Sequence, residues 1–135
     1  MLERLIIAVV ISLAGVALWC AYNRLSVRRA ASVAQHEPVL EQLQQGVATI
    51  LYFTTPFCEP CRTLQQPTLA QLEQELGPRL KVIKIDATEQ PDVADRWGVF
   101  SAPTTFVLDE HQQPRHVNRG VASAETLKKQ LGLVS

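Results

Sequence analysis

The Cys58-Glu59-Pro60-Cys61 motif follows an apolar run at residues 47–53, and this pairing constrains the chain more than any other feature. A strand that ends near Thr55 delivers Cys58 to a helix start, where unpaired N–H groups and the helix dipole favour a thiolate. Cys61 lies one turn deeper and is expected to be less exposed. Cys58 is therefore the expected nucleophile, and Cys61 is placed to attack the resulting mixed disulfide. The motif indicates a redox protein.

The two spacer residues act differently on this site. Pro60 suits a first helical turn because it lacks an N–H that would have no partner there. Glu59 adds a negative charge that opposes thiolate formation, and Arg62 is close enough in sequence to offset it.

The N-terminal segment at residues 5–22 contains no charged residue. At about 1.5 Å per residue, such a helix approaches the roughly 30 Å hydrocarbon core of a bilayer. Trp19 and Tyr22 end the run, where amphipathic rings prefer the headgroup region, and three arginines follow at positions 24, 28 and 29. We expect a membrane anchor at residues 1–22, a polar, basic linker at 23–37, and one domain at 38–135.

Two other interpretations of this segment stay open. A cleaved secretory signal also has a short polar start, here with Arg4, and an apolar core, but the small-x-small cleavage pattern is missing. Lipidation at Cys20 is disfavoured by the bulky Trp19 before it, so we expect Cys20 to be a small apolar residue facing lipid.

Flanking charge favours a cytoplasmic domain, while an extracytoplasmic domain remains the alternative, because one translocated domain can violate this rule. A catalytic cysteine pair occurs in reducing and oxidising compartments alike. The formal net charge is zero and no long block of like charge occurs, so we expect no nucleic-acid partner.

The remaining chain alternates between helical and extended patterns. Helices are predicted at 38–45, 58–76 (kinked by Pro67), 91–97 and 124–131, and strands at 47–54, 80–85, 104–108 and 115–118. Gly46 and Gly98 close two of the helices, and Ser123 is the expected N-cap of the last one.

This order, with the cysteine pair at the first strand–helix junction, resembles the thioredoxin fold, an α/β fold with a central mixed β-sheet flanked by helices. The resemblance is carried in register by four segments: FTTPFCEPC, KVIKIDATEQPDVADRWGV, SAPTTFVLD and the glycine of NRGVAS. Here one N-terminal transmembrane helix would precede that fold.

The resemblance implies a thiol–disulfide oxidoreductase whose redox-active disulfide joins Cys58 and Cys61. It implies a cis proline at Pro103 lying against the cysteine pair. The substrate groove would comprise Ala102, Pro103, Thr104, Glu59, Pro60 and Gly120. Expected partners are protein thiols or disulfides near the membrane and an upstream redox partner, with no cofactor, no metal and a monomeric chain. Pro67 resembles the proline that kinks the motif helix, one residue later than is typical.

Three departures limit what the resemblance implies. Typical thioredoxins carry a buried aspartate where this chain has Tyr52, so the usual route for the proton of Cys61 is absent. Thr54 and Phe57 replace the usual tryptophans, and the spacer is Glu-Pro in place of Gly-Pro. Family potentials run from about −270 to about −120 mV, so a reductase is expected and an oxidase stays open.

Two non-redox alternatives stay open. A cysteine pair can supply half of a zinc site or bind copper, but His36, His111 and His116 lie in linker or turn-like segments without matching spacing. A membrane-tethered binding domain could use the groove near Pro103 without catalysis. Trp97 is expected to be a packing residue, while Phe57 either contacts substrates or covers the sheet end.

Overall fold

The structure is a computed structural model and describes residues 1–41 and 46–132. Its elements are α1 (Leu2–Ala34), α2 (Pro38–Glu41), β1 (Ala48–Thr54), η1 (Cys61–Gln65), α3 (Gln66–Leu76), η2 (Gly77–Arg79), β2 (Leu80–Asp86), α4 (Pro91–Trp97), β3 (Thr104–Leu108), β4 (Pro114–Arg119) and α5 (Ala124–Gln130). Every strand lies within about two residues of its predicted range. The predicted helix at 38–45 is present from Pro38 to Glu41, and its last four positions fall outside the described residues.

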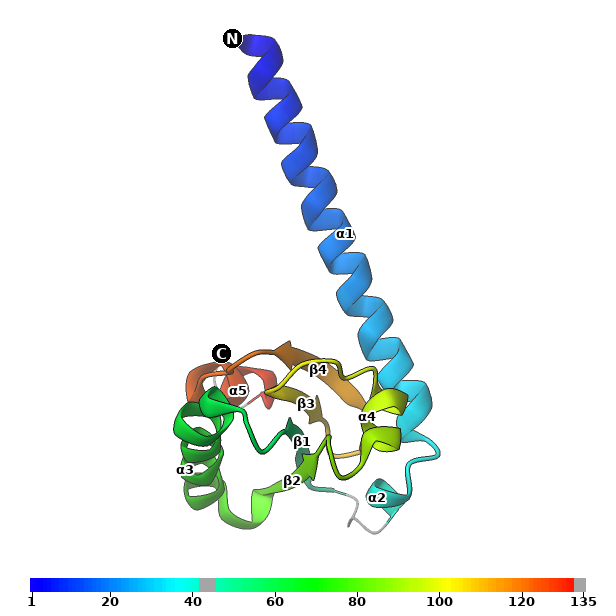
Figure 1. Ribbon diagram of the computed structural model, residues 1–135, viewed down its shortest axis with the longest axis vertical. Helices are drawn as coiled ribbons and strands as arrows, with labels where there is room; N and C mark the ends of the chain where they lie inside the picture. The colour runs from blue at the N-terminus through cyan, green and yellow to red at the C-terminus, as the bar shows by residue number, and fades with distance from the viewer. Residues whose placement is uncertain (42–45, 133–135) are drawn as a thin grey trace.

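The four strands form one mixed sheet in the order β2-β1-β3-β4 (Figure 1). β1 pairs in parallel with β2, and β3 pairs antiparallel with both β1 and β4. All residues of β1 except Ala48 are buried, as expected for a central strand covered on both faces. The cysteine motif follows the carboxyl end of this strand.

Helices cover both faces of the sheet. On one face α3 and α5, which contributes Leu127, pack over Ile50, Tyr52 and Val107 of the sheet, in a cluster that includes Cys61. On the other face α4 and the end of α1 pack over Phe53 and Phe106. Trp97 meets Phe106 edge to face at 5.0 Å, so its predicted packing role agrees with its position.

The N-terminal helix is a single rod of 33 residues. Its apolar stretch is exposed and is long and apolar enough to cross a membrane, a test that a signal sequence also passes. The helix continues through most of the segment predicted to be a linker and packs its last turns on β4 and α4 (Figure 1). Ala30 is fully buried there.

The segment after α1 is also held by the domain. Glu37 is 2% exposed, and its carboxylate accepts hydrogen bonds from the Trp97 indole Nε1 at 3.1 Å and from Arg96 Nη2 at 3.1 Å. The pKa of Arg96 is raised because its guanidinium donates to Glu37. A buried carboxylate needs such partners, and here they come from α4.

Candidate functional site

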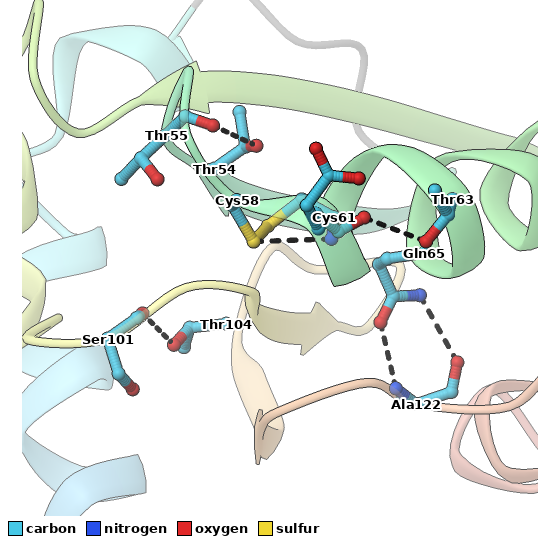
Figure 2. The surroundings of a disulfide bond; sticks show 10 residues. Thr54, Thr55, Cys58, Cys61, Thr63, Gln65, Ser101, Thr104 and Ala122 are labelled. Atoms are coloured by element: carbon cyan, nitrogen blue, oxygen red, sulfur yellow. Dashed lines mark hydrogen bonds between the residues drawn. A yellow bond between two sulfur atoms is a disulfide. The ribbon is translucent and has the colours of Figure 1, made fainter.

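Cys58 and Cys61 form a disulfide at the start of the motif helix, with an S–S distance of 2.10 Å (Figure 2). Cys58 is partly exposed, whereas Cys61 is 1% exposed and belongs to the core cluster beneath α3. The Cys61 backbone N–H donates to Cys58 Sγ at 3.2 Å. A donor aimed at that sulfur stabilises negative charge on it, so the geometry favours Cys58 as the sulfur that carries a thiolate.

The spacer residues lie on the surface beside the disulfide. Glu59 and Arg62 form an ion pair at 2.7 Å, each side chain about 70% exposed. This pairing places a positive charge next to Glu59, as the sequence suggested, although solvent weakens so exposed a pair.

The helix that carries Cys61 begins as a π-helix. Residues Cys61–Gln65 form this wider turn, in which the Gln66 N–H donates to the Cys61 carbonyl five residues earlier. Pro67 has no N–H to donate to the carbonyl four residues before it, and its ring crowds that carbonyl, which favours such local widening. Pro67, predicted to kink a continuous helix, therefore stands in the first turn of α3 just after a π-turn.

Gln65 connects the motif helix to the loop after β4. Its side chain is fully buried; its Nε2 donates to the Ala122 carbonyl at 3.1 Å, and its Oε1 accepts from the Ala122 N–H at 2.8 Å. Figure 2 shows the amide directed at Ala122 beside the disulfide. Sequence reasoning missed Gln65. The late position of Pro67 was the signal that residues between it and Cys61 adopt an unusual turn.

Three of the predicted groove residues, Glu59, Pro60 and Ala102, line a hollow together with Cys58. The Ala102–Pro103 peptide bond is cis, as the resemblance implied, and the Gly120 N–H donates to the Pro103 carbonyl at 2.9 Å. Thr104 is buried, and its Oγ1 donates to the Ser101 carbonyl at 2.7 Å, whereas Glu59 and Pro60 are exposed. The roles of these residues in binding substrate stay predictions.

A groove of about 580 Å³ opens next to Cys58. Its lining includes Phe57, Glu59, Pro60, Asp95, Phe100 and Ala102. Phe57 and Phe100 are 94% and 75% exposed, so two aromatic rings border the reactive sulfur without covering it. Phe57 therefore does not cover the sheet end, and its contact with substrates stays a prediction. Phe100 was not singled out from the sequence, because its exposure depends on the loop before Pro103.

Tyr52 lies under the motif helix, in the same cluster as Cys61. The side chain is 1% exposed, and its hydroxyl has no hydrogen-bond partner within the described part of the chain. The position for which the resemblance to thioredoxins implies a buried aspartate is thus occupied by a buried phenol.

The histidines and acidic residues do not assemble into a metal site. Across residues 1–41 and 46–132, no three His, Cys, Asp or Glu side chains lie close enough together to hold a metal ion. His36, His111 and His116 are exposed. The pKa of His116 is lowered, chiefly by partial loss of solvent and also by neighbouring Arg115.

Comparisons with known proteins agree with this geometry. A family model described as Thioredoxin matches residues 30–132. The chain is 31% identical over 94 residues to thioredoxin 1 of Synechococcus elongatus, covering 67% of this chain and 87% of that protein. It is 43% identical over 58 residues to the thioredoxin of Bacillus subtilis, covering 43% of this chain and 55% of that one.

Solved structures show the same fold. Chloroplastic thioredoxin z superimposes with a TM-score of 0.58 at 27% identity, covering 64% of this chain and 77% of that chain. A Fasciola hepatica thioredoxin superimposes with a TM-score of 0.57 at 22% identity, covering 65% and 81% respectively. The predicted fold class is confirmed.

Proposed function

The chain belongs to the thioredoxin family, and we propose that it is a membrane-anchored reductase that exchanges its Cys58–Cys61 dithiol with disulfides of proteins near the membrane. Family membership and the disulfide-forming pair support thiol–disulfide oxidoreductase activity. The observation that carries the proposal is the asymmetry of the pair: Cys58 is partly exposed and receives an N–H donor, while Cys61 is buried one turn below.

The reaction follows from that asymmetry. In the reduced protein, the Cys58 thiolate bonds to one sulfur of a substrate disulfide, the substrate S–S bond breaks, and the other substrate sulfur leaves as a thiolate. Cys61 then attacks Cys58 Sγ and expels the second substrate sulfur. The proton of the Cys61 thiol passes to a departing substrate thiolate, and a second proton comes from water. Two electrons move to the substrate, and an upstream dithiol protein restores the Cys58–Cys61 pair by the reverse exchange.

Membrane anchoring is supported by the exposed apolar surface of α1. Leu5, Ile11, Leu13 and Trp19 are 64 to 67% exposed, and a contiguous apolar surface of this kind needs lipid or a partner to cover it. We propose that residues 5–22 span the membrane once. The arginines that follow support a cytoplasmic domain, and protease digestion of intact and permeabilised cells distinguishes this from an extracytoplasmic one.

Substituting each cysteine in the full chain tests the proposed roles. We expect Cys58→Ser to abolish disulfide reduction and Cys61→Ser to accumulate mixed disulfides visible on non-reducing gels. Cys20→Ser is the matched control, because Cys20 is exposed on α1 and lies outside the disulfide. If Cys58→Ser reduced disulfides at the parent rate, the catalytic proposal would be wrong and a binding domain would replace it.

The direction of electron flow is tested by a redox titration. Thiol trapping of the Cys58–Cys61 pair across dithiothreitol or glutathione buffers should give a two-electron transition near −270 mV for a reductase. A midpoint near −120 mV would assign an oxidant instead.

A further inference from the structure

The end of α1 is built into the domain. Ala30 is fully buried in the core cluster that also contains Trp97 and Phe106. Arg29 Nη2 donates to the Asp95 carbonyl of α4 at 3.2 Å. Because α1 is one uninterrupted helix, these contacts fix the direction in which its apolar part leaves the domain.

Arg119, the last residue of β4, joins α1 to the rim of the disulfide groove. Its guanidinium lies 5.5 Å from the ring centroid of Tyr22 on α1 and 4.7 Å from that of Phe100 at the groove. It also donates to Ser26 Oγ and to the Gly98 carbonyl, each at 3.4 Å. One half-buried cation thus contacts both the anchor helix and the groove wall.

Two adjacent hollows lie on the surface between Cys58 and α1. The groove beside Cys58 shares Asp95, Val99 and Phe100 with a second hollow of about 450 Å³, whose other wall includes Tyr22 and Leu25 of α1. Leu25 is 62% exposed, so apolar surface continues from Phe57 and Phe100 onto the anchor helix.

The level of the bilayer surface follows from α1 as well. Trp19 and Tyr22 line a third hollow with Val121, Ala122 and Ser123. Tryptophan and tyrosine at the end of a span lie in the headgroup region, so the loop after β4 is at that level too. Ala122 in this loop is hydrogen-bonded to Gln65 of the motif helix. In Figure 1, α1 rises from the right of the domain beside α4, and the green helix that carries the motif stands at the left with its start at the upper end, toward which α1 projects.

From these positions we propose that the groove beside Cys58 faces the bilayer and extends along α1, and that its occupant is the juxtamembrane segment of a second membrane protein. The substrate cysteine lies within a few residues of that protein's own span, next to apolar side chains that contact Phe57, Phe100 and Leu25. This proposal rests on the proposed function, because it requires both the exchange reaction and the membrane span.

The test uses the full chain with Cys61→Ser, reduced and reconstituted in phosphatidylcholine–phosphatidylglycerol nanodiscs. Each nanodisc also holds a single-span peptide whose one cysteine is disulfide-bonded to thionitrobenzoate. The Cys58 thiolate bonds to the peptide sulfur, the peptide–thionitrobenzoate S–S bond breaks, and the thionitrobenzoate anion leaves. Mixed disulfides are counted on non-reducing gels.

The two peptides differ only in the position of the cysteine, about 3 or about 25 residues from the span. An extended residue adds at most about 3.5 Å, so the cysteine in the second peptide can lie well away from the bilayer surface. We expect the cysteine near the span to be trapped about tenfold faster than the far one. A groove held at the bilayer surface raises the effective concentration of a cysteine that lies at the same level. Equal rates for the two peptides would overturn the proposal.

Two insertions provide the matched comparison. A flexible Gly/Ser insertion of about ten residues between Asn23 and Arg24 frees the domain from the span, and should bring the near-to-far ratio to about 1. The same insertion between Gly77 and Pro78, in the exposed turn between α3 and β2, should leave the ratio unchanged. The proposal would be refuted if the near-to-far ratio stayed the same after the first insertion. It would also be refuted if mass spectrometry showed that residues 1–22 are removed from the mature protein.

A soluble disulfide of glutathione and thionitrobenzoate separates the two levels of inference. If Cys58 does not react with it, the proposed function fails. If it reacts but the two peptides are trapped equally, only the membrane-facing groove fails. Arg119→Met, which loosens the junction between α1 and the groove wall, should lower the near-to-far ratio.

Discussion

At the scale of single residues, Tyr52 is the most unusual member of the core around the disulfide. Its phenol is buried in contact with the cluster that includes Cys61, yet the hydroxyl finds no partner among the described residues. Burying a hydroxyl without a hydrogen bond is unfavourable, so Tyr52→Phe should leave stability unchanged or raise it by about 1 kcal/mol. Urea denaturation of the oxidised protein measures this.

Tyr52→Phe also tests whether the phenol takes part in catalysis. If the hydroxyl takes no part in moving the Cys61 proton, turnover of Tyr52→Phe should match the parent across pH. A large fall in turnover at unchanged stability would instead assign the phenol to proton transfer.

Gln65 is the residue whose loss should loosen the site most. Gln65→Met keeps the length of the side chain but leaves the buried N–H and carbonyl of Ala122 without partners. We expect a loss of about 2 kcal/mol in the free energy of unfolding, within the range for unsatisfied buried groups. Amide hydrogen exchange at Ala122 should speed up, and protection equal to the parent's would show that the pairing is not maintained in solution.

At the scale of elements, the β3–β4 hairpin depends on one carboxylate. Asp109 accepts hydrogen bonds from the backbone N–H groups of His111 and Gln113, and from Arg115 Nε at 2.8 Å. Partial burial raises the pKa of Asp109, but these donors together outweigh it and hold the pKa below its usual value. The ionised form therefore stabilises the hairpin above about pH 4, the pKa of an unfolded aspartate.

This contribution is lost as the pH falls through the lowered pKa of the folded protein. Asp109→Asn keeps an acceptor for the two N–H groups but lacks the charge, so its unfolding free energy should fall less steeply than the parent's between about pH 5 and pH 2. Arg115→Gln removes only one of the donors to Asp109, so the slope of its unfolding free energy against pH should lie between those of the parent and Asp109→Asn. Parallel pH curves for parent and Asp109→Asn would contradict the assignment.

At the scale of the whole molecule, α1 is as much a part of the domain as an appendage to it. A soluble chain that begins at Asn23 keeps Arg29 and Ala30, whereas one that begins at Ser32 lacks both. We expect the shorter chain to be less stable by about 2 kcal/mol, because the apolar surface under Ala30 becomes exposed. Urea denaturation of the two chains also tests the predicted domain boundary at 37/38, and equal midpoints would make the docked helix dispensable.

The sheet was predictable because its strands alternate or run apolar between strong turn residues, and the cysteine motif identified the site directly. The packing of α1 on the domain was not predictable from the sequence, because residues 23–37 look polar and basic. The burial of Ala30 and Glu37 depends on Trp97, some sixty residues later in the chain. The exposure of Phe100 likewise depends on tertiary contacts, whereas the π-turn at Cys61–Gln65 has a local signal in the position of Pro67.

The docked helix also decides how reaction partners meet. With α1 in a bilayer, the domain rotates about the membrane normal but does not tumble, so Cys58 stays at one depth. Encounter with a membrane substrate then becomes a lateral search in a plane, and its rate scales with the number of molecules per unit area of membrane. Diluting both proteins with lipid would slow the exchange, whereas diluting the vesicles in buffer would not.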